Sequence, residues 1–385
     1  MKKYAFGTIA SIFVLSVHAQ TPPWPFAPPN EGALSIILLG DNNFQYRENP
    51  EEALKYLIPT LQQADFNFLN LEGPFAGGTD DTTKTDIPHK NWRYSNPDQV
   101  AAITAAPIDA VGVANNVTYP WQALMKSLHV LDSVGVKYAG GGKNLEAAHQ
   151  PVIVEKKGLK VGFMQYAATV FPYNHAATED RPGIAQIKVH TAYQPPPNLD
   201  KPGQPPVVIT WLDENSKQQM IRDIQSLNKQ ADIVIASFHW GVSGTTQPVS
   251  YQTDIARAVI DAGADVVFGH GPHRYQKIEV YKDKPIFYSL GQAAFDDRRS
   301  DRWRRFREGL LVRLSIKDKE IQSVDMVPTW RDNDNFVRLY NPNTDQGREL
   351  FGILKSVNNE GAPLELTEHT IQVKSFDYTS WRLNP

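Results

Sequence analysis

The chain has 385 residues, with 39 basic and 42 acidic side chains and no cysteine. This length can bury one large core or two ordinary ones, and the lack of cysteine excludes disulfides, thiolate metal sites and a cysteine nucleophile. Without residues 1–19, which hold two lysines and no acid, 37 basic side chains face 42 acidic ones, a net charge of −5. Nucleic-acid binders normally carry a basic excess, so we expect no nucleic-acid partner.

The first residues predict a secretory signal peptide. Lys2 and Lys3 precede the apolar stretch "YAFGTIASIFVLSV", and "VHA" ends at Ala19 as a small-residue cleavage site. The apolar stretch is too short to favour a permanent membrane span. We therefore predict a periplasmic or extracellular protein, whose only membrane contact would be an uncleaved N-terminal segment.

After a proline-rich leader (residues 20–32), short apolar runs alternate with amphipathic segments. Strands are expected over 34–40, 66–72, 110–116, 160–167, 231–240, 264–270 and 284–291, with a hairpin over 310–328. Helices are expected over 50–64 and 251–263. This alternation predicts an α/β layered domain with its functional residues beyond the carboxyl ends of the strands.

Two further segments differ from this pattern. Residues 192–215 contain "YQPPPNLDKPGQPP", and we expect them to form an excursion on the surface. Residues 331–385 are more polar and less periodic. We predict that they form a C-terminal extension packed on a main domain of residues 33–330.

Five of the expected strands end in side chains that can bind a metal ion. These are Asp41, Glu72, Asn116, His239, and the pair His270 and His273. Oxygen and imidazole ligands suit manganese, zinc, iron or magnesium. Each has a simpler alternative, since histidines often pack by hydrogen bonding, Asp41 could cap a turn and Asn116 could be a turn residue. Glu72 needs a partner because a buried ionised carboxylate is costly. The coincidence of five strand ends favours a metal site.

The order of these motifs resembles the CapA family of poly-γ-glutamate or capsule synthesis proteins, within the calcineurin-like metallophosphatase superfamily. The resemblance spans residues 33–330 and is most specific from His239 to Gly291. It implies a two-sheet β-sandwich flanked by helices in four αββα layers. The matching motifs are "LLGD" (38–41), "LNLEGPF" (69–75), "VGVANN" (111–116), "LDSVGVKYAGGGKNLEAAHQP" (131–151), "RPGIAQI" (181–187), "ADIVIASFHWG" (231–241), "DAGADVVFGHGPHRYQKIEVYKDKPIFYSLG" (261–291) and "FD" (295–296).

The resemblance also implies two divalent metal ions that would neutralise phosphoryl oxygens and activate water. Catalytic roles would fall to His239, His273 and Asn116. The implied ligands are Asp41 and His273 for the first metal, Glu72 as the bridge, and Asn116, His239 and His270 for the second.

Some positions depart from the family pattern. Val117 stands where the family has a histidine associated with leaving-group protonation or transition-state contact, and valine can do neither. Gln292 replaces an asparagine, and Asn43 stands at the third position of the Asp-x-His element. His89 and His175 are other histidines that loops could bring to the site. Two interpretations therefore stay open: a metal-dependent hydrolase, or a catalytically degenerate protein that binds metal or polymer during assembly.

The arginine-rich run "RRSDRWRRFR" (298–307) follows the last family motif. Arginine forks suit carboxylate or phosphate chains, so Arg298, Arg299 and Arg302 are candidate substrate-binding residues, although charge runs are often solvated faces. The expected partners are an anionic polymer or phosphoester substrate and other proteins of envelope polymer synthesis. Neither "KYAGGGKN" (137–144) nor "GVSGT" (241–245) fits a P-loop or a nucleophile elbow. We therefore predict a role in the synthesis, attachment or processing of an anionic extracellular polymer such as poly-γ-glutamate.

Overall fold

A computed structural model describes residues 25–26, 31–45, 47–77, 94–171, 174–196, 198, 200, 203–296 and 306–374. The predicted signal peptide and most of the proline-rich leader lie outside the described residues. So do His89 and the three arginines predicted to bind substrate, Arg298, Arg299 and Arg302.

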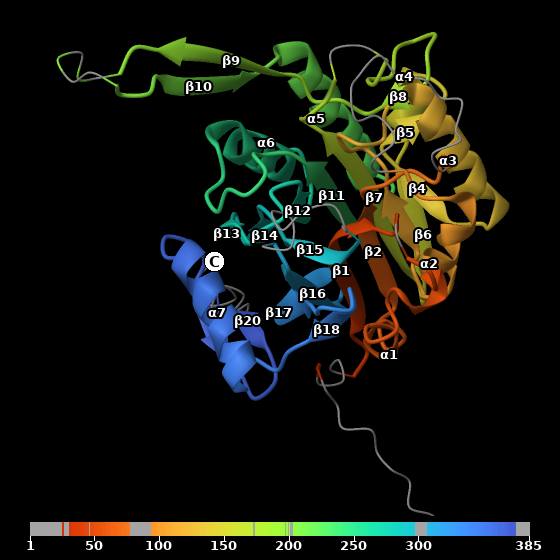
Figure 1. The fold of residues 1–385 in the computed structure, drawn as a ribbon, viewed down its shortest axis with the longest axis vertical. Coiled ribbons are helices and arrows are strands. Elements are labelled where there is room, and N and C mark those ends of the chain that lie inside the picture. Colours follow the sequence, from red (N-terminus) through yellow and green to blue (C-terminus); the bar gives the residue numbers. More distant parts are fainter. Residues whose placement is uncertain are drawn as a thin grey trace, which may run out of the picture.

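Ten strands form the larger sheet (Figure 1). In spatial order eight of them are β19 (Leu364–Leu366), β20 (Ile371–Val373), β17 (Glu320–Arg331), β16 (Glu308–Lys317), β1 (Leu34–Asn43), β2 (Phe66–Leu71), β3 (Ala110–Gly112) and β4 (Lys137–Ala139). In addition, β15 (Gln292–Phe295) pairs with β1 and β18 (Val337–Leu339) pairs with β17. Strands β1 to β4 are parallel, so their carboxyl ends lie at one edge. The expected hairpin over 310–328 is present as β16 and β17.

A second sheet of six strands packs against the first. In spatial order its strands are β13 (Ile278–Tyr281), β14 (Lys284–Phe287), β12 (Val266–His270), β11 (Ile233–His239), β7 (Leu159–Ala167) and β6 (Val152–Lys156). Strands β7, β11, β12 and β14 are parallel. The short strands β5 (Gly141–Gly142) and β8 (Gly183–Ile184) form a separate pair.

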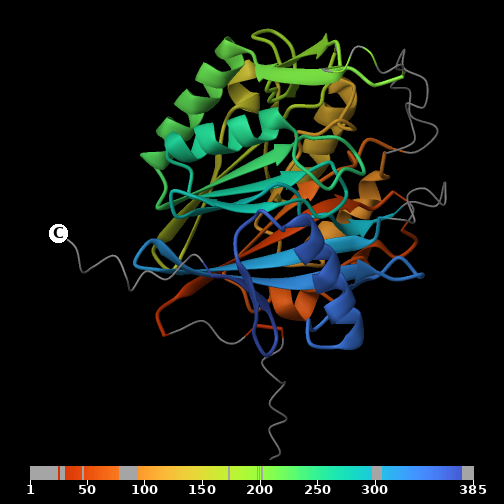
Figure 2. The same ribbon diagram turned by 90° about the vertical axis from the view of Figure 1, so that its left-hand side faces the viewer.

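Three apolar clusters account for the layers of the fold. One fills the space between the sheets, where Phe68 stacks on Phe163 with ring centroids 5.1 Å apart and Phe268 follows in the same cluster. The second lies between the first sheet and α1 to α3, and the third between the second sheet and α5 and α6, which are green in Figure 2. The predicted four-layer sandwich is thereby confirmed. The helices are α1 (Ile58–Leu61), α2 (Ala101–Thr104), α3 (Trp121–Ser133), α4 (Leu145–Ala148), α5 (Glu214–Asn228), α6 (Ser250–Asp261) and α7 (Asp345–Val357).

The prediction of one helix over 50–64 was wrong. The segment has a 3-10 turn, η1 (Pro50–Glu52), then irregular turns and the four-residue α1. Pro59 lacks the N–H that a continuous helix would need, whereas proline is readily accommodated in the first turn of a new helix. A second 3-10 turn, η2 (Pro97–Val100), precedes α2. None of the helices among the described residues has the length and apolarity needed to cross a membrane.

The expected surface excursion contains regular structure. Strands β9 (Val189–Gln194) and β10 (Val207–Leu212) form an antiparallel hairpin that extends away from the sandwich (Figure 1). Farther along the chain, α7 packs Leu354 and Val357 into the cluster between the sheets, and β20 pairs with β17.

Candidate metal centre

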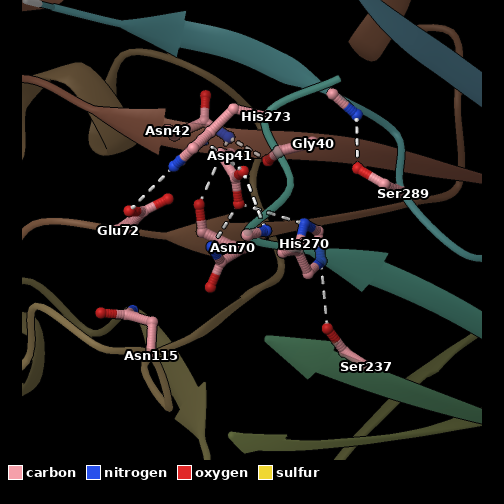
Figure 3. A network of polar contacts seen from close by, with 12 residues as sticks. Gly40, Asp41, Asn42, Asn70, Glu72, Asn115, Ser237, His270, His273 and Ser289 are labelled. Carbon is pink, nitrogen blue, oxygen red and sulfur yellow. Dashed lines mark hydrogen bonds and ion pairs between the residues drawn. The ribbon is translucent and has the colours of Figure 1, made fainter. Parts of the chain in front are cut away.

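The candidate ligands come from the carboxyl ends of strands in both sheets. Asp41 lies in β1, Glu72 follows β2 directly, and His239 and His270 end β11 and β12, where they are register partners. Asn116 lies in the segment after β3. In Figure 3 the labelled side chains of Asp41, Glu72, His270 and His273 point toward one another.

Asp41 is aimed by a β-bulge. The register between β1 and β2 shifts between Leu39 and Asp41, and the backbone N–H of Asp41 donates to the Gly291 carbonyl at 3.0 Å. A Cβ atom at Gly40 would collide with that same carbonyl, so glycine is required beside the aspartate. Bulges re-aim side chains next to functional sites, and this one turns Asp41 toward the histidines.

The turn after β12 surrounds the Asp41 carboxylate. Its Oδ1 lies 3.4 Å from His270 Nδ1 and its Oδ2 lies 3.0 Å from His273 Nδ1, while the N–H of Gly271 donates to Oδ2 at 3.2 Å. His270 is oriented from its other side, because Nε2 lies 3.1 Å from Ser237 Oγ. Burial acts to raise the pKa of Asp41, but the interactions of its carboxylate with His270 and His273 hold that pKa well below its usual value.

The backbone of this turn is unusual. Gly271 has φ +101°, and an added Cβ would lie 2.7 Å from the Trp240 carbonyl oxygen and 3.1 Å from His239 Nε2. His273 has φ +59°, a left-handed conformation that is uncommon for residues other than glycine. Such conformations persist where the surrounding structure holds them, and they concentrate at functional sites.

Glu72 and His239 complete the cluster. His273 Nε2 lies 3.6 Å from Glu72 Oε1, so the ring of His273 stands between the two carboxylates. Asp41, Glu72 and His239 each offer a ligand atom, and these atoms all lie within 4.8 Å of one another. Both carboxylates are fully buried, and burying two anions together is unfavourable unless positive charge is supplied.

The donor set fits divalent metal ions. Carboxylate and imidazole groups without thiolates match manganese, zinc, iron or magnesium. Among the described residues, the buried Oδ1 of Asn116 is one of several side-chain atoms without a hydrogen bond, so this oxygen is available to a further ligand. The ligand roles of the six residues remain predictions, as does the number of ions.

The other asparagines of these motifs have structural roles. Asn43 donates through Nδ2 to the Glu72 carbonyl at 2.6 Å and accepts the N–H of Gln45 at 3.0 Å, which ties the end of β1 to the end of β2. Asn115 donates to the Leu71 carbonyl at 2.8 Å and accepts from the N–H of Thr118 at 3.1 Å. Both side-chain amides therefore hold the loops that carry the candidate ligands.

The positions that replace family residues lie beside the cluster. Val117 is buried, and its N–H donates to Asn115 Oδ1 at 3.2 Å. His175 accepts the N–H of Phe171 at Nδ1 and donates through Nε2 to the Asn115 carbonyl, both at 3.0 Å. Burial lowers the pKa of His175 to about 3, so the ring is neutral and both nitrogens are occupied. His175 therefore supports the loop and is not placed to donate a proton.

Gln292, the other replaced position, pairs in register with Asp41, and its Oε1 lies 3.5 Å from Nη2 of Arg331. Sequence reasoning missed two buried amides beside Asp41, those of Asn70 and Gln165. The available signal was a polar residue inside an apolar strand, since a buried amide requires partners.

The model of the family described as "Bacterial capsule synthesis protein PGA_cap" matches residues 34–297, which include all six candidate ligands. The chain belongs to this family. The matched region ends within the residues that follow β15, before the hairpin of β16 and β17.

Curated relatives have names that agree with this family. The Capsule biosynthesis protein CapA of Bacillus anthracis is 26% identical over 73% of this chain, and the aligned part spans 62% of the relative. The PGA biosynthesis protein CapA of Bacillus subtilis is 25% identical over 85% of this chain and 80% of the relative. A probable polyglutamine synthesis accessory protein of Mycobacterium tuberculosis is 28% identical over 72% of this chain and 68% of the relative.

Solved structures show more distant likenesses. A hypothetical protein from Thermus thermophilus aligns with a TM-score of 0.43 at 12% identity, over 77% of this chain and 98% of that chain. A phosphatase from Mycoplasma pneumoniae aligns with a TM-score of 0.42 at 13% identity, over 77% of this chain and 93% of that chain. Likenesses of this strength assign no activity.

Proposed function

We propose that this protein is an exported, metal-dependent hydrolase of the CapA type, which acts in the synthesis, attachment or processing of an anionic extracellular polymer such as poly-γ-glutamate. Membership of the capsule synthesis family supports a polymer of this kind as the substrate. Metal-dependent hydrolysis is supported by one observation. Two fully buried carboxylates, Asp41 and Glu72, lie close to His239, His270 and His273.

The residues of the cluster have separate tasks in this proposal. Asp41, Glu72 and the histidines would hold two divalent ions, with Asn116 as a further ligand. When bound, such ions supply positive charge that polarises a phosphoryl or carbonyl group and lowers the pKa of water. The N–H of Gly271 holds Asp41 Oδ2 from the protein side, and Ser237 fixes the ring of His270. The partners would be an anionic chain and other proteins of envelope polymer synthesis.

A phosphodiesterase assay tests this proposal. Apo protein is loaded with Mn²⁺ and supplied with bis-p-nitrophenyl phosphate, and we expect turnover that His239→Ala abolishes. His149→Ala is the matched control, because His149 is also buried but its Nδ1 lies 2.7 Å from Oδ2 of Asp223, a residue outside the cluster. Equal turnover in both variants would contradict the assignment of His239.

A specific observation favours a second candidate, a metal- or polymer-binding assembly protein that lacks turnover. Val117 occupies the place of the family's histidine, and His175, which bonds the neighbouring Asn115 carbonyl, is neutral and bonded at both nitrogens. Saturable Mn²⁺ binding without phosphodiesterase turnover would favour this candidate over the hydrolase.

A further inference from the structure

A buried chain of amide hydrogen bonds links the two sheets at the candidate metal centre. Asn70 in β2 donates through Nδ2 to Asp41 Oδ1 at 2.8 Å. Its own Oδ1 accepts from Nε2 of Gln165, in β7 of the other sheet, at 2.7 Å. Gln165 Oε1 in turn accepts the backbone N–H of Ala114 at 3.0 Å. Asn70 and Gln165 are 0% and 1% exposed, so water does not compete for these bonds.

The backbone group at the far end determines the direction of every bond in this chain. The N–H of Ala114 can only donate, so Gln165 must present its oxygen there and its nitrogen to Asn70. Asn70 must then present its oxygen to Gln165, which leaves its nitrogen for Asp41. Asp41 Oδ1 therefore always meets a donor, and the carboxylate cannot rotate without breaking a buried hydrogen bond.

The neighbouring backbone leaves room for this chain. A Cβ atom at Gly112 would collide with the side-chain amide of Gln165. A Cβ atom at Gly140 would lie 2.6 Å from the Gln165 carbonyl oxygen and 2.7 Å from the Cβ of Ala114. Two glycines from separate strand ends thus clear the space that Gln165 occupies between the sheets.

We propose that Asn70 and Gln165 are positioning residues that hold the Asp41 carboxylate in the orientation needed to bind metal. Because Ala114 lies two residues before Asn116, the same chain also couples Asp41 to the segment that carries this candidate ligand. The proposal rests on the metal centre proposed above. Asn70 bonds Asp41 and Gln165 bonds Asn70, so both amides act on metal affinity through Asp41.

Calorimetric titration of the apo protein with Mn²⁺ tests this role. Partners that orient a metal ligand typically contribute 10–100-fold in affinity, so Asn70→Leu should weaken Mn²⁺ binding by about 10–100-fold. The matched control is Asn67→Leu, because Asn67 is a buried asparagine of the same strand whose amide donates to the Leu61 and Pro107 carbonyls instead. The control should change the affinity less than about 2-fold, and thermal melting confirms that each variant is folded.

A double-mutant cycle distinguishes a chain of bonds from general loss of packing. Gln165→Met breaks the same chain of hydrogen bonds one residue farther from Asp41. This variant provides the test if Asn70→Leu fails to fold. The double variant should bind Mn²⁺ no more weakly than the weaker single variant, because each substitution already interrupts the chain. Wild-type affinity in folded Asn70→Leu or Gln165→Met would overturn the positioning role alone. Absence of Mn²⁺ binding in the wild type would instead overturn the proposed metal centre.

Discussion

Two neighbouring regions at the carboxyl ends of the strands differ in chemistry. In the corner formed by Asp41, Glu72 and His273, buried charged and imidazole groups face one another at 3.0–3.6 Å. In the loop from Asn115 to Val117, the Asn115 amide bonds the backbone and the next-but-one side chain is an apolar valine. We propose that the corner holds metal, whereas the valine in the loop cannot donate a proton. Metal binding and turnover can therefore be separated by experiment.

The largest effect is expected from removing the corner's central carboxylate. Asp41→Ala deletes the group that contacts both His270 and His273, so Mn²⁺ affinity should fall by more than about 100-fold, beyond the usual loss of a supporting residue. Calorimetric titration measures this. The control is Asp65→Ala, at the opposite end of the same strands, where Asp65 accepts the N–H of Ser35. If both variants bind Mn²⁺ as the wild type does, Asp41 is not a ligand.

The second prediction concerns the missing histidine of the loop. Val117→His supplies an imidazole at the position of the family's histidine, and general acid catalysis typically contributes at least about 100-fold. We expect a gain of that size in the turnover of bis-p-nitrophenyl phosphate at equal Mn²⁺ loading. Val117→Leu serves as the control for a change of side-chain volume. No gain in a folded, metal-loaded Val117→His variant would show that turnover is limited elsewhere.

A smaller effect is expected at the turn that joins the two histidines. Gly271→Ala adds a Cβ at φ +101° against the Trp240 carbonyl, which should cost about 1–3 kcal/mol in the free energy of unfolding and weaken Mn²⁺ binding. Gly135→Ala is the matched control, because Gly135 has φ +73° but its Cβ would meet nothing within 4 Å. Chemical denaturation and titration of both variants separate backbone strain from contact with the site. Equal Mn²⁺ affinity in the two variants would show that the turn at Gly271 does not affect metal binding.

The last prediction concerns stability alone, in the pH dependence of unfolding that His175 contributes. Its pKa in the folded state is about 3, below the usual 6.5, so the unfolded chain takes up the proton first. Its contribution to stability is complete above pH 6.5 and is lost as the pH falls toward 3, with a slope approaching about 1.4 kcal/mol per pH unit. His175→Gln should flatten the pH dependence of unfolding in this window relative to the wild type. Parallel curves for the two proteins would show that His175 is not buried as a neutral ring.

The sequence was most informative where local pattern and burial coincide. The apolar runs before Asp41, His239 and His270 predicted strands β1, β11 and β12, because continuous apolar runs are typical of strands buried on both faces. The prediction of a helix over 50–64 was wrong because it relied on amphipathic periodicity and ignored Pro59, which lacks the N–H that a continuous helix needs. The helix α5 was not anticipated, although Asp213 caps it by accepting the N–H of Ser216.

The candidate site was predictable in part. Ligand types at strand ends can be identified from sequence, because parallel strands bring their carboxyl ends to one edge. The contact of Asn70 with Gln165 joins residues 95 positions apart in different sheets, and no local pattern encodes such a pairing. The same holds for His175, whose role depends on the Asn115 carbonyl 60 residues away.

Anomalous scattering from crystals grown with Mn²⁺ tests directly whether this cluster binds two metal ions. We expect two peaks at the manganese absorption edge, both within ligand distance of the cluster formed by Asp41, Glu72, His239, His270 and His273, with one peak also near Asn116 Oδ1. A well-ordered crystal of the wild-type protein with no anomalous peak at this cluster would contradict this expectation.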